Sequence, residues 1–150
     1  MRAWPPGRCP IRSAGQTLEV HLEPGVWVDA DSNRIFQVIG NVVANAVRHC
    51  RAGDTIVVTV RKSDSWGVLT VRDTGPGIPA DALPHIFDRF YRADGASLGP
   101  GSGIGLAVVR ALTVAHGGQA DITSEVGSGT TVTVRLPLAG LKPGPAEPVT

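Results

Sequence analysis

The sequence predicts an α/β (α+β) fold, a two-layer sandwich in which helices cover one face of a mixed β-sheet. Two observations predict it. Short segments rich in β-branched residues recur along the chain, and two segments with helical periodicity lie between them. A chain of 150 residues is also long enough for one domain with its own core.

The elements follow from this pattern in chain order. The expected strands are residues 17–22, 26–30, 55–61, 66–72, 120–124 and 130–136. The expected helices run from Asp31 or Ser32 to about Cys50, and from Ser102 or Gly103 to the glycine pair after His116, with a short helical piece within 80–87. The expected layout is an irregular arm at 1–15, a domain at 16–138 with a lid-like loop at 88–102, and a disordered tail at 139–150.

Composition limits the classes of partner. The net charge is +1, so charge alone favours neither a nucleic acid nor an anionic membrane surface. No run approaches the ~18 apolar residues of a membrane span, and we expect no membrane contact by this chain. Two cysteines make no disulfide framework, so we expect a cytoplasmic location, with tethering to a membrane through a partner or a missing N-terminal region left open.

The helix at 32–50 carries an unusual polar stripe. At ~100° per residue one arc is apolar and the other is rich in amides. The apolar arc holds Ile35, Val38, Ile39, Val42, Val43 and Ala46, and the polar arc holds Arg34, Gln37, Asn41, Asn45 and Arg48. Amide oxygens suit Mg²⁺ and an arginine suits phosphate, although a solvated helix face with incidental amides is an equal alternative.

Two glycine-rich segments and an aromatic segment follow. Asp73 ends a strand and precedes Gly75 and Gly77, so its carboxylate could accept from the exocyclic amine of adenine; an ordinary turn is the alternative. The glycines of residues 99–105 run into a helix, where N–H groups and the helix dipole can cradle phosphate. Two arginines within residues 87–92 could neutralise phosphate charge, unless the segment is simply an aromatic corner.

The order of these motifs resembles the histidine-kinase branch of the ATPase superfamily that includes gyrase B, Hsp90 and MutL. Asn-x-x-x-Asn, Asp-x-Gly-x-Gly, Phe-x-x-Phe and Gly-x-Gly-x-Gly-Leu look like its N, G1, F and G2 boxes, over roughly residues 16–138. The resemblance implies the Bergerat ATP-binding fold and ATP with Mg²⁺ as cofactors. It places Asn45 as the principal Mg²⁺ ligand with Asn41 beside it, and Arg48 on phosphate.

The same resemblance assigns the remaining nucleotide contacts. Asp73 would bind adenine N6, Thr130 would support that contact, and His49 would lie near the base, where the family often has tyrosine. The other implied positions are Gly75, Gly77, Ile78, Phe87, Arg89, Phe90, Arg92, Gly101, Ser102, Gly103, Ile104, Gly105 and Leu106. His49 and Arg48 depart from the usual family residues, which puts the stacking of the base and the geometry at phosphate in question.

The implied activity is that of a protein-histidine kinase of a two-component system. The four histidines, His21, His49, His85 and His116, lack the acceptor motif of the family, so a separate dimerisation or phosphotransfer domain is expected to carry the acceptor. The phosphate would then pass to a response regulator. The alternatives are a serine kinase of the anti-sigma-factor type and a non-catalytic nucleotide-binding interaction module.

Overall fold

The computed structural model describes residues 7–11, 15–87 and 105–139. The strands are β1 (Gly7–Ile11), β2 (Gln16–Leu22), β3 (Thr55–Ser63), β4 (Trp66–Asp73), β5 (Gln119–Glu125) and β6 (Gly129–Pro137). The helices are α1 (Ser32–His49) and α2 (Gly105–Ala115), with a 3₁₀ turn, η1 (Leu83–His85).

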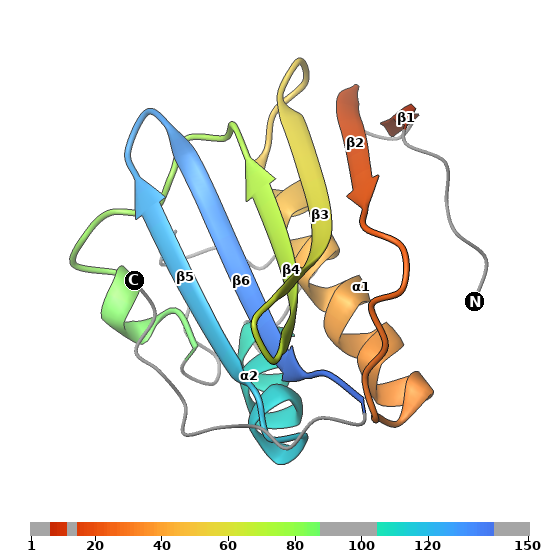
Figure 1. Ribbon diagram of the computed structural model, residues 1–150. Coiled ribbons are helices and arrows are strands. Elements are labelled where there is room, and N and C mark those ends of the chain that lie inside the picture. Colours follow the sequence, from red (N-terminus) through yellow and green to blue (C-terminus); the bar gives the residue numbers. More distant parts are fainter. Residues whose placement is uncertain (1–6, 12–14, 88–104, 140–150) are drawn as a thin grey trace.

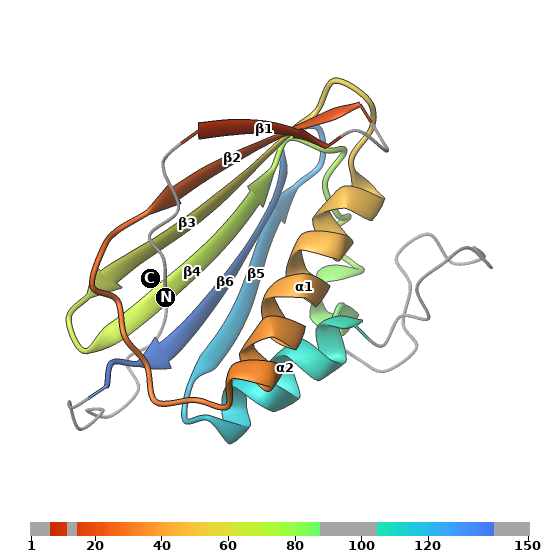
Figure 2. The ribbon, with the colours of Figure 1, turned by 90° about the vertical axis from the view of Figure 1, so that its right-hand side faces the viewer.

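The six strands of the described residues form one mixed sheet in the order β1-β2-β3-β4-β6-β5 (Figure 1). β2 and β3 run parallel, and every other neighbouring pair is antiparallel. Both α1 and α2 lie on the same face of this sheet, as Figure 2 shows. The two-layer sandwich expected from the sequence is therefore confirmed.

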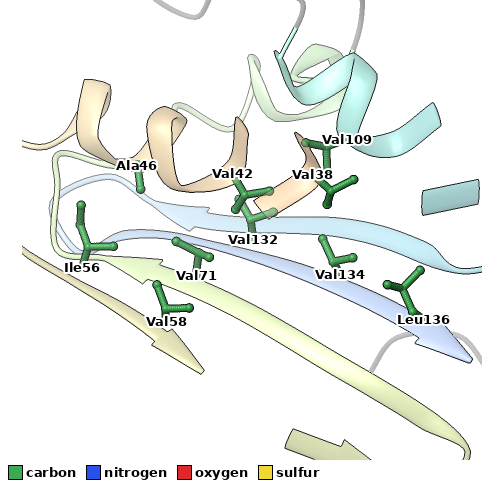
Figure 3. Packing of buried hydrophobic residues seen from close by; sticks show 10 residues of the cluster. All are labelled: Val38, Val42, Ala46, Ile56, Val58, Val71, Val109, Val132, Val134 and Leu136. Carbon is green, nitrogen blue, oxygen red and sulfur yellow. The ribbon is translucent and has the colours of Figure 1, made fainter. Parts of the chain in front are cut away.

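The core lies between α1, α2 and the middle of the sheet (Figure 3). Its buried members are Val38, Val42, Ala46, Ile56, Val58, Val71, Val109, Val132, Val134 and Leu136. The apolar arc predicted for α1 is the face that points into this cluster, because a helix lying on a sheet buries one stripe of side chains. The polar stripe next to this arc is exposed at Gln37 and buried at Asn45, and its Asn41 lies beside Gly105 at the start of α2.

Side-chain hydrogen bonds set both ends of α1. Asp31 is the N-cap residue, and its Oδ1 accepts from the backbone N–H groups of Asn33 at 2.9 Å and Arg34 at 3.2 Å. At the other end, the buried Nε2 of Gln16 donates to the carbonyl oxygens of Val47 and Cys50 at 2.9 and 3.0 Å. β2 thus fastens the last turn of α1, which carries the polar stripe to the end of the sheet.

The C-terminal end of α2 is joined to the beginning of α1. Gly117 takes φ +79°, the left-handed conformation that ends many helices. His116 Nδ1 lies 2.7 Å from the carbonyl oxygen of Leu112, and its Nε2 accepts from the backbone N–H of Asp31 at 3.3 Å. The imidazole of His116 therefore links the C-terminal end of α2 to the N-terminal end of α1.

Two expectations about the first thirty residues are wrong. Residues 7–11 were expected to be irregular, but they pair with β2 as an edge strand, where backbone pairing needs no alternating side chains and a proline is tolerated. Residues 26–30 were expected to be a strand, but they make only an isolated bridge between Val28 and Leu138. Val26 and Val28 instead lie over Gly67, which offers no side chain at that point of the sheet.

The other expected strands, the helix at 32–50 and the hairpin around Asp64 are confirmed to within two residues at each end. The described part of the second helix begins at Gly105, while the expected lid and tail lie outside the described residues. No helix among the described residues is both long enough and apolar enough to cross a membrane.

Replacing the cap of α1 tests how the helix is held. We expect Asp31→Ala to lower the free energy of unfolding by about 1 kcal/mol, because two backbone N–H groups lose their acceptor. Urea denaturation followed by circular dichroism measures the loss. Asp29→Ala removes an exposed carboxylate two residues earlier and should change stability by less than about 0.5 kcal/mol. Equal losses in the two variants would contradict a capping role for Asp31.

Candidate nucleotide-binding site

Asp73 is a buried carboxyl group at the last position of β4. Only 3% of the residue is exposed, and the alternation along the strand turns its side chain toward the helices, on the same face as Val71. Its Oδ1 accepts from the backbone N–H groups of Gly75 at 2.9 Å and Thr130 at 3.3 Å. Both bonds use the same oxygen, so the second oxygen, Oδ2, is the atom that further donors meet.

Burial raises the pKa of the Asp73 carboxyl above its ordinary value, because the charged form loses its contact with water. The hydrogen bonds from Gly75 and Thr130 and the nearby charge of His49 lower the pKa, but they do not cancel the effect of burial. A carboxylate with this environment gains from any ligand that brings a hydrogen-bond donor to it.

The thiol of Cys50 is a neighbour of this carboxyl group that the sequence did not single out. Burial raises the pKa of Cys50 to about 12, and the charge of Asp73 and a hydrogen bond to it act in the same direction. A Cβ placed on Gly75 would lie 3.0 Å from Asp73 Oδ1 and 3.5 Å from Cys50 Sγ, so the three residues meet at one point. The position of Cys50 directly after the last turn of α1 was the available signal.

The two glycines after Asp73 serve the protein's own packing. A side chain on Gly77, which has φ +81°, would collide with the backbone carbonyl of Glu125 in the turn between β5 and β6. The backbone N–H of Gly127 donates to the Pro76 carbonyl at 2.9 Å and holds the same two segments together. That these glycines admit a flat base stays a prediction, and close approach of backbone to backbone explains Gly77 without a ligand.

The polar stripe of α1 ends beside Asp73. Asn45 is 6% exposed, and its Oδ1 accepts from Arg48 Nη2 at 2.9 Å. Asn41 is half-buried, and its Nδ2 lies 3.5 Å from the carbonyl oxygen of Gly105 at the start of α2. A solvated helix face therefore does not describe Asn45, since a buried amide one turn from an arginine is held in place.

A chain of hydroxyl groups joins the loop after β4 to the start of β6. Ser124 Oγ accepts from the backbone N–H of Ile78 at 2.7 Å, and it lies 2.8 Å from Thr130 Oγ1 and 3.0 Å from the carbonyl oxygen of Gly129. Thr130, expected from the sequence to support the base, is thus adjacent to Asp73 through its own N–H. Ser124 was not predicted, because a serine on an alternating strand carries no distinctive pattern.

Three other expected positions lie in a second apolar cluster. Ile78 and Leu106 are buried in it together with Ala82 and Ile86, and Phe87 packs against it. The guanidinium carbon of Arg110, a residue that the sequence did not single out, lies 5.8 Å from the centre of the Phe87 ring. Arg89, Phe90, Arg92, Gly101, Ser102, Gly103 and Ile104 lie outside the described residues.

A cavity of about 490 Å³ opens at the same end of the sheet. Its lining includes Asp73, Ser124 and Thr130, but also Arg72 and Thr131, which alternate with them and belong to the opposite face. The cavity marks this end of the sheet as hollowed and does not by itself assign a ligand to one face.

The donor set also limits the metal that fits. In residues 15–87 and 105–139, no three His, Cys, Asp or Glu side chains gather as they would around a metal ion. A neutral amide oxygen such as Asn45 Oδ1 suits a cation that keeps waters and takes its remaining ligands from a substrate, as Mg²⁺ does with phosphates. Asn45 Oδ1 therefore fits Mg²⁺ that arrives with a nucleotide.

Comparison with known proteins agrees with this geometry. Residues 30–140 match the family model of the histidine kinase-, DNA gyrase B- and HSP90-like ATPases, and the chain belongs to this family. Within the family it is homologous to the ATP-binding domains of sensor histidine kinases. The resemblance inferred from the four motifs is therefore confirmed.

Three relatives illustrate the match. The sensor protein SrrB of Staphylococcus aureus is 40% identical over 114 residues, which are 75% of this chain and 19% of SrrB. A structure of the mycobacterial sensor histidine kinase MprB is 32% identical with a TM-score of 0.74, covering 83% of this chain and 84% of that one. A structure of full-length ShkA in complex with AMPPNP is 31% identical with a TM-score of 0.69, covering 81% and 26%. The chain thus spans about a fifth of the length of SrrB.

The raised pKa of Asp73 has a consequence for stability. The folded protein holds this proton to higher pH than the unfolded chain does, so stability falls as the pH rises from the ordinary carboxyl pKa through the folded one. At pH 7.5, without nucleotide, we expect Asp73→Asn to raise Tm by about 2–5 °C, since a neutral amide can still accept from Gly75 and Thr130.

Thermal melts by circular dichroism check this expectation. The difference in Tm should shrink as the pH is lowered toward the ordinary carboxyl pKa. Asp81→Asn, at an exposed position in the same loop, is the control and should leave Tm unchanged. A lower Tm for Asp73→Asn at pH 7.5 would mean that the ionised carboxylate stabilises the fold.

Proposed function

We propose that this chain binds Mg·ATP at the end of β4, beside the polar stripe of α1, and donates the γ-phosphate to a histidine on a separate dimerisation or phosphotransfer domain. The phosphate would pass from there to an aspartate of a response regulator. The observation that carries the proposal is the buried Asp73 carboxyl, oriented by two backbone N–H groups and adjacent to Thr130, in a chain of the histidine-kinase ATPase family.

The base would lie against Asp73. An ionised carboxylate accepts hydrogen bonds only, so it matches the exocyclic amine of adenine. The buried environment strengthens such a contact, because little water competes for the carboxylate. His49, the last residue of α1, interacts electrostatically with Asp73 and would lie beside the base.

The phosphates would lie along α1 toward the start of α2. Mg²⁺, when bound, would supply neutralisation of the charge that develops on the phosphates. Asn45 would offer its amide oxygen to that cation, and Arg48 hydrogen-bonds to the same oxygen. Arg48, one turn from Asn45 on the same stripe, would direct its guanidinium to the phosphates.

Asn41 bears on the fate of the γ-phosphate. Its amide cannot remove a proton from water, so it offers no general base for hydrolysis. Its Nδ2 lies 3.5 Å from the Gly105 carbonyl, at the junction of α1 with the expected phosphate loop. This arrangement favours transfer to an acceptor that a partner presents, where positioning and charge neutralisation supply most of the catalysis.

The first test is calorimetric titration of the chain with Mg·ATP. We expect binding by the wild type and a loss of at least about tenfold in affinity for Asp73→Asn, because the amide brings a donor to face the adenine amine. Asp81→Asn is the matched control and should bind like the wild type. Absence of binding by a folded wild type, or rapid release of phosphate from bound ATP, would contradict the proposal.

The second test concerns Asn45. In Asn45→Ala the affinity for ATP should be the same with Mg²⁺ and with EDTA, whereas the wild type should bind more tightly with Mg²⁺, since only the wild type supplies the amide oxygen. Gln37→Ala removes an exposed amide from the same stripe and should keep the Mg²⁺ dependence. A Mg²⁺ dependence that persists in Asn45→Ala would exclude Asn45 as the ligand.

A further inference from the structure

The hydroxyl group of Ser124 is surrounded by three polar partners. The backbone N–H of Ile78 donates to it at 2.7 Å, the carbonyl oxygen of Gly129 lies at 3.0 Å, and Thr130 Oγ1 lies at 2.8 Å. Ser124 belongs to β5, Ile78 to the loop after Asp73, and Gly129 and Thr130 begin β6. One serine thus joins three segments at the end of the sheet.

The number of protons decides the direction of these bonds. A serine hydroxyl has one proton to give and two lone pairs to accept with, and the Ile78 N–H occupies one lone pair. If Ser124 donated to Thr130, its oxygen would face the Gly129 carbonyl oxygen at 3.0 Å with no proton between them. If Ser124 donates to Gly129, its second lone pair accepts the proton of Thr130 and all three contacts are satisfied. The second arrangement is therefore the stable one.

This direction commits the only hydroxyl proton of Thr130. With that proton held by Ser124, Thr130 Oγ1 can only accept from whatever lies on its other side. The backbone N–H of Thr130 is itself bonded to Asp73 Oδ1 at 3.3 Å, and the two residues are directly opposite partners of β4 and β6, so their side chains lie on the same face of the sheet. An ionised Asp73 also accepts only.

We propose that Ser124 is a specificity-determining residue: by orienting the hydroxyl proton of Thr130, it makes the base end of the site accept hydrogen bonds, and so favours a purine with an amine at C6 over one with a carbonyl. The inference rests on the proposed nucleotide site. Ser124 acts through Thr130 and Ile78 and need not touch the ligand.

A purely structural role for Ser124 makes a different prediction. If Ser124 only joins Ile78 to β6, the loss of its hydroxyl group lowers the affinity for all purine nucleotides by the same factor. If it sets the direction of the Thr130 proton, its loss lets that hydroxyl rotate and donate to a C6 carbonyl. The ratio of two affinities separates the roles, whereas either affinity alone does not.

The experiment titrates the full chain with Mg·ATP and with Mg·ITP, whose base carries a carbonyl in place of the adenine amine. We expect the wild type to bind ATP more tightly than ITP. In Ser124→Ala the ratio of these two affinities should fall roughly fivefold, which corresponds to about one hydrogen bond. Ser128→Ala, an exposed hydroxyl in the adjoining turn, should keep the wild-type ratio. In a Thr130→Val background, Ser124→Ala should no longer change the ratio, since no hydroxyl remains to be turned.

Each outcome decides a separate point. If the wild type and Ser124→Ala have the same ATP-to-ITP ratio, the inference is overturned while the proposed function stands. If a folded wild type binds neither nucleotide, the proposed function is overturned, and the inference with it. Should Ser124→Ala fail to fold, Ser124→Cys fills the same space with a weakly hydrogen-bonding group and is judged by the same ratio.

Discussion

The packing of α1 on the sheet positions the side chains of the candidate site. Val38, Val42 and Ala46 are buried against the strands, and this fixes the rotation of the helix about its axis. The neighbouring stripe then carries Asn45, which is buried, and Asn41, which reaches the carbonyl of Gly105 at the start of α2. Because β2 holds the last turn of α1 through Gln16, the end of the helix that approaches Asp73 cannot drift along the sheet.

Asp73 shows how stability and binding oppose each other at this site. Burial disfavours its charge, and two backbone N–H groups recover only part of that cost. A hydrogen bond donated by a ligand therefore stabilises this buried carboxylate more than it would stabilise a carboxylate in water. The hydroxyl chain from Ile78 through Ser124 to Thr130 adds a fixed hydrogen-bond direction beside it. The buried carboxyl group and the hydroxyl groups lie side by side, as the proposed nucleotide site requires.

Much of this could be predicted from local patterns. Helical periodicity predicted both the buried arc of α1 and its amide stripe, and β-branched alternation predicted the hairpin of β3 and β4. Sequence patterns did not predict β1, because that strand depends only on backbone pairing with β2. They also failed near Gly67, where the absence of a side chain decides how the neighbouring segment packs. The sequence assigned Gly77 to ligand binding, but in the fold Gly77 allows its backbone to pack closely against the turn after β5.

The sequence by itself determined the two-layer fold and the positions of Asn45 on a helix stripe and Asp73 at a strand end, because spacing within a helix or strand is a local property. The family, and Thr130 as a candidate residue, followed from the resemblance of its motifs to those of a known family. Only the tertiary structure decided that Cys50 and Ser124 join them, and that Arg48 hydrogen-bonds to the Asn45 oxygen. Cys50 meets Asp73 and Ser124 meets Ile78 across more than twenty residues of chain, and only the assembled sheet and helix bring such side chains within hydrogen-bonding distance.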